Sequence, residues 1–215
     1  MQEGLARRGV LDVLVGLLPR ALDAPKELTP VYASVIAILG SYVDAAYELL
    51  PAVTLERLVA LVFDARPELA PLSFFTVQTL SQIAARQLPA TRDAFVALIA
   101  RVFAKLDSAT GPFRKGLLLL FKAIAGFKDV PAYELAPRVP VLADLLAGDE
   151  ETTLCASEAL LAVAAHDDCV RLVTAKLPAV FARLRGAEGI VVGSLLTLVT
   201  AATRSDDDVE MVCES

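Results

Sequence analysis

Apolar residues recur along the chain with the spacing of helices. Residues 54–64 carry apolar side chains at the i, i+3, i+4 and i+7 positions, which form one face of a helix. The charge-free runs 31–43 and 189–203 are shorter than the roughly 20 residues that span a bilayer, so they predict helices buried on several sides. Turn signals such as Thr29-Pro30 and Gly111-Pro112 separate these segments. The pattern predicts an all-α protein without an integral membrane segment.

A helical unit repeats along the chain with a period of about 40 residues. The longer predicted helices end on one series of apolar residues: Leu39, Ile83, Ile124, Val163 and Val199. The helices between them share a second series: Leu14, Leu58, Leu98, Leu142 and Val180. One such unit cannot bury its apolar faces alone, so we expect neighbours to stack into a continuous core. The expected domain is single and covers 1–215, with units at roughly 1–43, 44–87, 88–127, 128–165 and 166–204 and a partial unit or capping helix at 205–215.

Two motifs in these units resemble a known repeat. Residues 9–18 read Gly-Val-Leu-Asp-Val-Leu-Val-Gly-Leu-Leu, and two longer helices end in Thr-Leu-Ser-Gln-Ile-Ala at 79–84 and Ala-Leu-Leu-Ala-Val-Ala at 159–164. They resemble the second and third helices of the armadillo repeat family. The HEAT repeat is a close alternative, because prolines disturb the second-helix segments at Pro19, Pro140 and Pro178. The resemblance covers essentially the whole chain and implies a right-handed α-solenoid of about five armadillo or HEAT-like repeats.

In armadillo proteins the third helices line a concave groove. In the nuclear-import receptors of that family, Trp and Asn four residues apart hold an extended basic peptide in the groove. This chain has no Trp and no Asn, so that ladder cannot form. The matching pairs are Ser34 and Ile38, Gln78 and Gln82, Leu119 and Ala123, Glu158 and Ala162, and Ser194 and Leu198.

A groove built from these pairs would have small or apolar walls and a polar centre, which suits a partner helix or extended segment with Phe74 or Phe75 as an anchor. The alternative is that several of these side chains face the core, because a register error of one residue turns a side chain by about 100°. The resemblance therefore predicts the following partner-binding residues: Ser34, Ile38, Phe74, Gln78, Gln82, Leu119, Lys122, Glu158, Ser194 and Leu198.

Charge and cysteine content restrict the partners and the compartment. A net charge of -6 and a pI near 4.9 argue against binding to nucleic acid or to an anionic membrane surface. The three cysteines, Cys155, Cys169 and Cys213, show no framework spacing, which favours a reducing compartment and buried thiols. Charged residues interrupt the N-terminal apolar stretch, so no secretory signal is expected. These features predict an intracellular, cytoplasmic protein.

The chain offers little chemistry for catalysis. His166 is the only histidine and is followed by Asp167, Asp168 and Cys169, which would suit a metal site or a Cys-His pair. Zinc prefers four ligands and no second cluster is visible, so we expect a turn in which Asp167 or Asp168 caps the next helix. The run 206–208 of three aspartates fits a solvated helix start better than a calcium loop. We expect no catalytic residue, no cofactor and no metal, and therefore a protein that is not an enzyme.

Two functional hypotheses follow. The first is a non-enzymatic protein–protein interaction scaffold that binds a partner helix or extended segment through its concave surface. The alternative is a structural or regulatory subunit of a larger complex, which contacts its neighbours through its ends. Residues 208–215 align with the first helix at 169–176, so the chain would stop in the same phase in which it starts. This predicts a fragment of a longer solenoid, an end-to-end contact through a helix from Val209 to Cys213, or a capping helix there.

Overall fold

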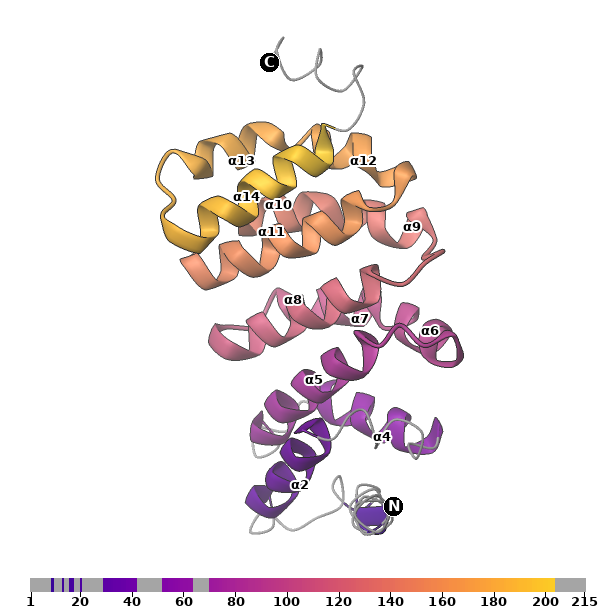
Figure 1. The fold of residues 1–215 in the computed structure, drawn as a ribbon. Helices are drawn as coiled ribbons and strands as arrows, with labels where there is room; N and C mark the ends of the chain where they lie inside the picture. The colour runs from indigo at the N-terminus through magenta and orange to yellow at the C-terminus, as the bar shows by residue number, and fades with distance from the viewer. Residues whose placement is uncertain are drawn as a thin grey trace, which may run out of the picture. The chain divides into compact units, whose positions relative to one another are not determined.

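The computed structural model describes residues 9, 13, 16–17, 20, 29–41, 52–63 and 70–203, and within these ranges every regular element is a helix (Figure 1). The chain divides into two compact units, Met1–Arg86 and Gln87–Ser215. Their boundary lies one residue from the predicted boundary between the second and third repeats. The predicted helix from Val209 to Cys213 lies outside the described residues, as does most of the motif at 9–18. The all-α prediction is confirmed.

The first unit contains α2 (Thr29–Ser41), α4 (Ala52–Phe63) and α5 (Ala70–Ala84). Helix α5 packs against both α2 and α4. Pro30 occupies the first turn of α2, where its missing N–H group costs nothing, as its position in the sequence predicts. The hydroxyl of Thr79 donates a hydrogen bond to the carbonyl of Ile36 at 3.2 Å, which joins α5 to α2 inside the core.

The second unit repeats a short first helix, a second helix and a long third helix three times. The first repeat contains α6 (Pro89–Val96), α7 (Ile99–Leu106) and α8 (Gly111–Ala125). In the next, α9 (Ala132–Leu135) and a 3-10 turn (Ala136–Arg138) precede α10 (Val139–Leu145) and α11 (Glu150–Ala164). The third contains α12 (Asp167–Thr174), α13 (Leu177–Leu184) and α14 (Gly189–Ala202). Helix α11 packs between α8 and α14, as Figure 1 shows.

Small side chains let these third helices approach closely. Ala156, Ser157 and Ala159 of α11 are fully buried. Larger side chains fill the space between the second and third helices: Phe121 of α8 meets Phe103 of α7 edge-on, with 4.8 Å between ring centroids. Gly111 and Gly189 stand at the first residues of α8 and α14 with φ of 53° and 56°, a conformation that glycine adopts without strain.

Helix α11 has a side-chain cap at its N-terminus. The Oδ1 atom of Asp149 accepts a hydrogen bond from the backbone N–H of Thr152 at 2.7 Å. This bond holds the pKa of the Asp149 carboxyl below its ordinary value of 3.8. Because the folded-state pKa is lowered, the carboxylate contributes stability at pH values above 3.8, and that contribution disappears as the pH falls through the folded-state value.

Replacement of Asp149 with alanine is therefore expected to lower the melting temperature at neutral pH, because it removes the cap. The difference between wild type and variant should shrink as the pH falls below 3.8. Thermal melts followed by circular dichroism at several pH values measure this difference. Asp144→Ala is the matched control, because Asp144 is exposed and belongs to no N-terminal cap. A pH-independent difference for Asp149→Ala would contradict the capping role.

The prediction that Asp167 or Asp168 caps α12 is wrong. His166 is the N-cap residue and makes no side-chain cap bond, because the helix begins at Asp167, so both aspartates lie inside the first turn. Their negative charge there still interacts favourably with the helix dipole. Cys155 and Cys169 are buried, as predicted, and burial raises the pKa of both thiols. Cys213 lies outside the described residues.

Candidate functional site

The candidate site is the solvent-exposed side of the third helices in the second unit. Helices α8, α11 and α14 begin at Gly111, Glu150 and Gly189, each 39 residues after the one before, so equivalent residues form rows across the helices. One such row contains Leu119, Glu158 and Thr197, and none of these three is buried. We define the third-helix face by side chains that are at least partly exposed: Lys115, Leu119, Lys122, Glu151, Glu158, Ser194 and Thr197.

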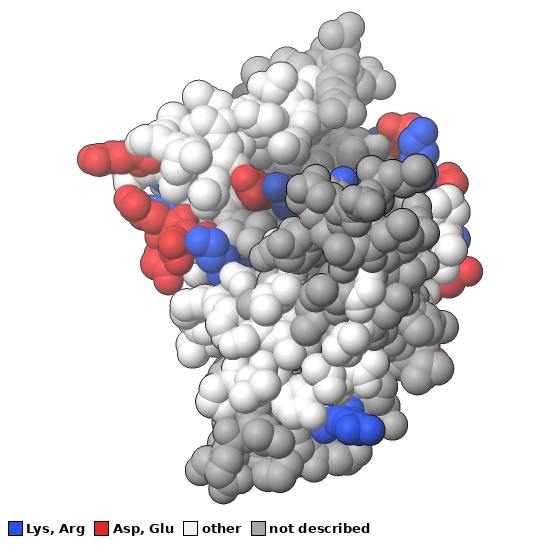
Figure 2. Space-filling model, turned by 60° about the horizontal axis from the view of Figure 1, so that its bottom comes forward, with Lys and Arg blue, Asp and Glu red and all other residues white. Residues whose placement is uncertain are grey.

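Two ion pairs cross this face from α8 to α11. Lys115 Nζ lies 3.2 Å from Glu151 Oε1, and Lys122 Nζ lies 2.9 Å from Glu158 Oε2. The side chains of Lys122 and Glu158 are 44% and 32% exposed, and exposed pairs of this kind contribute only about 0–1 kcal/mol. A ligand could therefore separate them at small cost. In the view of Figure 2, negative and positive side chains lie next to each other in a group at the left edge, whereas the positive group at the bottom has no negative side chain drawn beside it.

A hydroxyl pair links α11 to α14. The Oγ atoms of Ser157 and Ser194 are 2.7 Å apart, and Ser157 is fully buried. The Ser194 hydroxyl thus has an internal partner, although its residue is partly exposed. The structure places this predicted site residue at the boundary between the face and the core.

Leu198 does not belong to the face, and its prediction as a partner-binding residue is wrong. Its side chain is 0% exposed. Alignment of the apolar helix ends pairs Val199 with Val163. Alignment of the helix starts, which are 39 residues apart, instead pairs Leu198 with the buried Ala159. The exposed equivalent of Glu158 is Thr197, which the sequence analysis missed. Gly111 and Gly189, the first residues of α8 and α14, are the sequence signal that indicates this register.

The predicted residues of the first unit occupy neighbouring helices. On α2, Ser34 and Ile38 are exposed, and the Ser34 hydroxyl donates to the carbonyl of Pro30 at 3.0 Å. On α5, Gln78 and Gln82 are exposed, while Phe74 is half-buried beside Phe75, with 5.3 Å between ring centroids. Each of these side chains is accessible to a partner.

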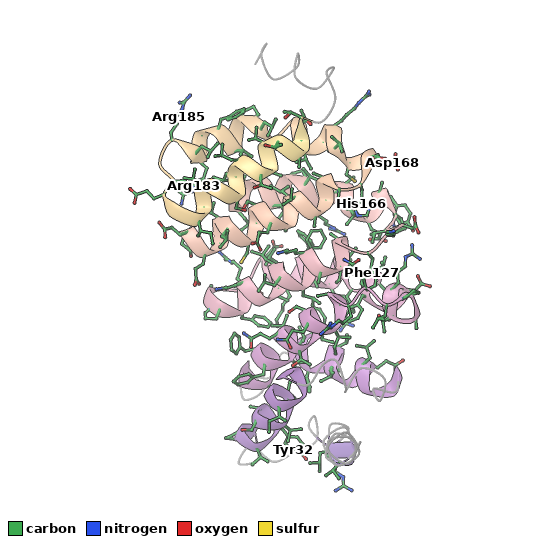
Figure 3. All side chains as sticks on the ribbon, in the orientation of Figure 1. Tyr32, Phe127, His166, Asp168, Arg183 and Arg185 are labelled. Atoms are coloured by element: carbon green, nitrogen blue, oxygen red, sulfur yellow. The ribbon has the colours of Figure 1, made fainter. Side chains whose placement is uncertain are left out.

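The turn at His166 connects two repeats. The Nε2 atom of His166 lies 2.6 Å from the carbonyl oxygen of Ala125, and because a carbonyl only accepts, Nε2 carries the donated hydrogen. This bond ties the start of α12 to the C-terminal end of α8; Figure 3 shows His166 close to the segment of Phe127. The Cys169 side chain is fully buried. Among the described residues, no group of three or more His, Cys, Asp or Glu side chains could hold a metal ion.

Comparison with known proteins supports the fold assignment. A search of solved structures found a designed armadillo repeat protein in complex with the peptide (KR)4, at a TM-score of 0.74 and 22% sequence identity. The match covers 94% of this chain and 85% of the designed protein. The armadillo-type repeat fold that the sequence motifs predict is therefore confirmed.

The other comparisons add no family. Neither a scan against protein-family models nor a search of curated proteins gave a match. Within the described ranges, no helix has the length and apolar character needed to cross a membrane.

Proposed function

We propose that this protein is a non-enzymatic scaffold that binds a partner protein through the third-helix face. The observation that carries the proposal is the row arrangement of α8, α11 and α14, which presents accessible side chains at equivalent positions on three adjacent helices. Surfaces of this kind bind an extended segment or a helix along their length. The peptide complex of the designed armadillo repeat protein supports the same mode of binding.

The charges of the face favour a particular kind of segment. Lys115 and Lys122 form a basic row on α8, and Glu151 and Glu158 form an acidic row on α11. Thr197 and the partly exposed Ser194 add hydroxyl groups on α14. A bound segment that places carboxylates over α8 and cations over α11 would complement both rows. Such a segment differs from the extended basic peptide that a Trp and Asn ladder binds, because this chain has no Trp and no Asn to form that ladder.

A photo-crosslinking amino acid tests the location. Placed at Thr197, it is expected to capture a partner from cells that contain the protein. The same group at Ala104, an exposed position on the second helix α7, is the matched control and is expected not to capture that partner. Capture of the same partner from both positions would contradict binding at the third-helix face.

A charge swap then tests the chemistry with the purified partner. The double variant Lys122→Glu with Glu158→Lys keeps an internal ion pair but reverses both charges, so the fold should be retained. Because charge complementarity contributes to affinity, the swap is expected to weaken binding at least about tenfold in a titration by fluorescence anisotropy. An unchanged Kd would contradict the proposed role of the two rows.

Exposed apolar side chains favour a second candidate function, a subunit of a larger complex. Leu172 of α12 is 43% exposed, and Ile190 and Leu196 of α14 are 73% and 52% exposed. Large apolar side chains at a surface are typical of protein contacts. The same crosslinker at Leu172 distinguishes the two functions, because Leu172 lies on the first helix α12. A subunit that uses this surface would be captured from Leu172 and not from Thr197.

A further inference from the structure

A cavity of about 410 Å³ lies between the second helices α10 and α13. None of its lining residues comes from α8, α11 or α14, so it is separate from the third-helix face. We call it the α10–α13 groove. It is lined by Ala143, Asp144, Leu146, Ala147, Ala179, Ala182 and Arg183.

The groove has apolar walls and small side chains. Leu146 and Ala143 are buried, while Ala147, Ala179 and Ala182 are exposed. An alanine side chain ends at Cβ, so these positions leave room for the side chain of another molecule between the two helices. Removal of that side chain from water would be favourable, because burial of one large apolar side chain contributes about 1.5–3 kcal/mol.

Two opposite charges flank this apolar region. Asp144 is exposed on α10, and Arg183 is partly buried on α13. The Nε atom of Arg183 donates to the Thr153 hydroxyl oxygen at 3.4 Å, which orients the guanidinium while its terminal nitrogens keep further donors. Within the described ranges neither Asp144 nor Arg183 forms an ion pair, with each other or with a third residue. Both charges therefore remain available to a ligand.

We propose that the α10–α13 groove binds a helix of a partner protein. That helix places an apolar side chain in the cavity, a carboxylate against Arg183 and a cation beside Asp144. A short amphipathic helix suits the groove because α10 and α13 are themselves only 7 and 8 residues long, which is about two turns. The opposite charges of Asp144 and Arg183 favour a partner that carries both a cation and a carboxylate over a neutral apolar molecule, which would pair with neither. This surface is additional to the third-helix face and does not depend on it.

A displayed library of helical peptides provides the probe. Selection on the wild-type chain, with removal of binders to Ala182→Trp, isolates peptides that need the open cavity. The expected peptides share a Leu, Met or Phe with Asp or Glu on one flank and Lys or Arg on the other. Their affinity, measured by fluorescence anisotropy, should fall at least about tenfold for Arg183→Glu, because the carboxylate then meets a like charge.

Reversal of the peptide charge separates recognition from damage to the fold. A peptide with its carboxylate replaced by arginine should regain affinity for Arg183→Glu, which a merely misfolded variant would not show. The swap Lys122→Glu with Glu158→Lys should leave peptide binding at the α10–α13 groove unchanged. Loss of partner binding at the third-helix face is therefore measured separately from binding at the groove. Three outcomes would overturn the proposal: no enrichment of acidic residues, no rescue by the reversed peptide, or self-association of the wild-type chain that Ala182→Trp abolishes.

Discussion

Replacement of Phe121 with alanine is expected to lower the free energy of unfolding by about 3–5 kcal/mol. The Phe121 side chain is 0% exposed and fills the space between α7 and α8. Its ring meets Phe103 at an interplanar angle of 88°, an edge-on contact that adds to the loss of buried area. Alanine would leave a cavity that the surrounding helices can close only in part.

Urea unfolding followed by circular dichroism measures this loss. Phe113→Ala is the matched control, because Phe113 lies on the same helix but is only partly buried. We expect the control to lose clearly less stability than Phe121→Ala. Equal losses for the two variants would contradict the central position of Phe121 in the core.

Replacement of Thr174 with valine is expected to lower the free energy of unfolding by about 1–3 kcal/mol. The Thr174 hydroxyl lies 2.7 Å from the carbonyl oxygen of Ala202, the last residue of α14. Carbonyls in the last turn of a helix have no donor within the helix. Both residues are buried, so valine, which nearly matches threonine in shape, would leave that carbonyl without its hydroxyl donor.

Thr174→Ser separates the hydroxyl from the methyl group. It keeps the donor to Ala202 and removes only one buried carbon, so it should lose about 1 kcal/mol. Unfolding of both variants in urea gives the comparison. A serine variant that is less stable than the valine variant would show that packing, and not the hydrogen bond, determines the contribution of Thr174.

The sequence predicts the repeat because apolar side chains must be buried at a helical period. The predicted helices 31–43 and 54–64 differ from α2 and α4 by no more than two residues at either end. Proline and glycine mark these ends clearly. The armadillo motifs add the order of the helices, which apolar spacing alone does not distinguish from other helical repeats.

The register of individual side chains is harder to predict. Alignment of the helix ends on apolar residues places Leu198 at the surface, because apolar residues occur on both the buried and the exposed sides of α14. The bond between His166 and the carbonyl of Ala125 joins residues 41 positions apart and has no local signal. The α10–α13 groove depends on which alanines of two neighbouring repeats face each other, and that is set by packing between the repeats.

The polar links between third helices also bear on how the chain folds. Among the described residues of the second unit, they connect adjacent third helices: Lys122 with Glu158 across 36 positions and Ser157 with Ser194 across 37. No such link has to wait for a distant part of the chain, so each helix can dock as soon as the preceding one is in place. Folding of such a repeat can therefore begin at any adjacent pair of helical units and extend to the neighbouring units.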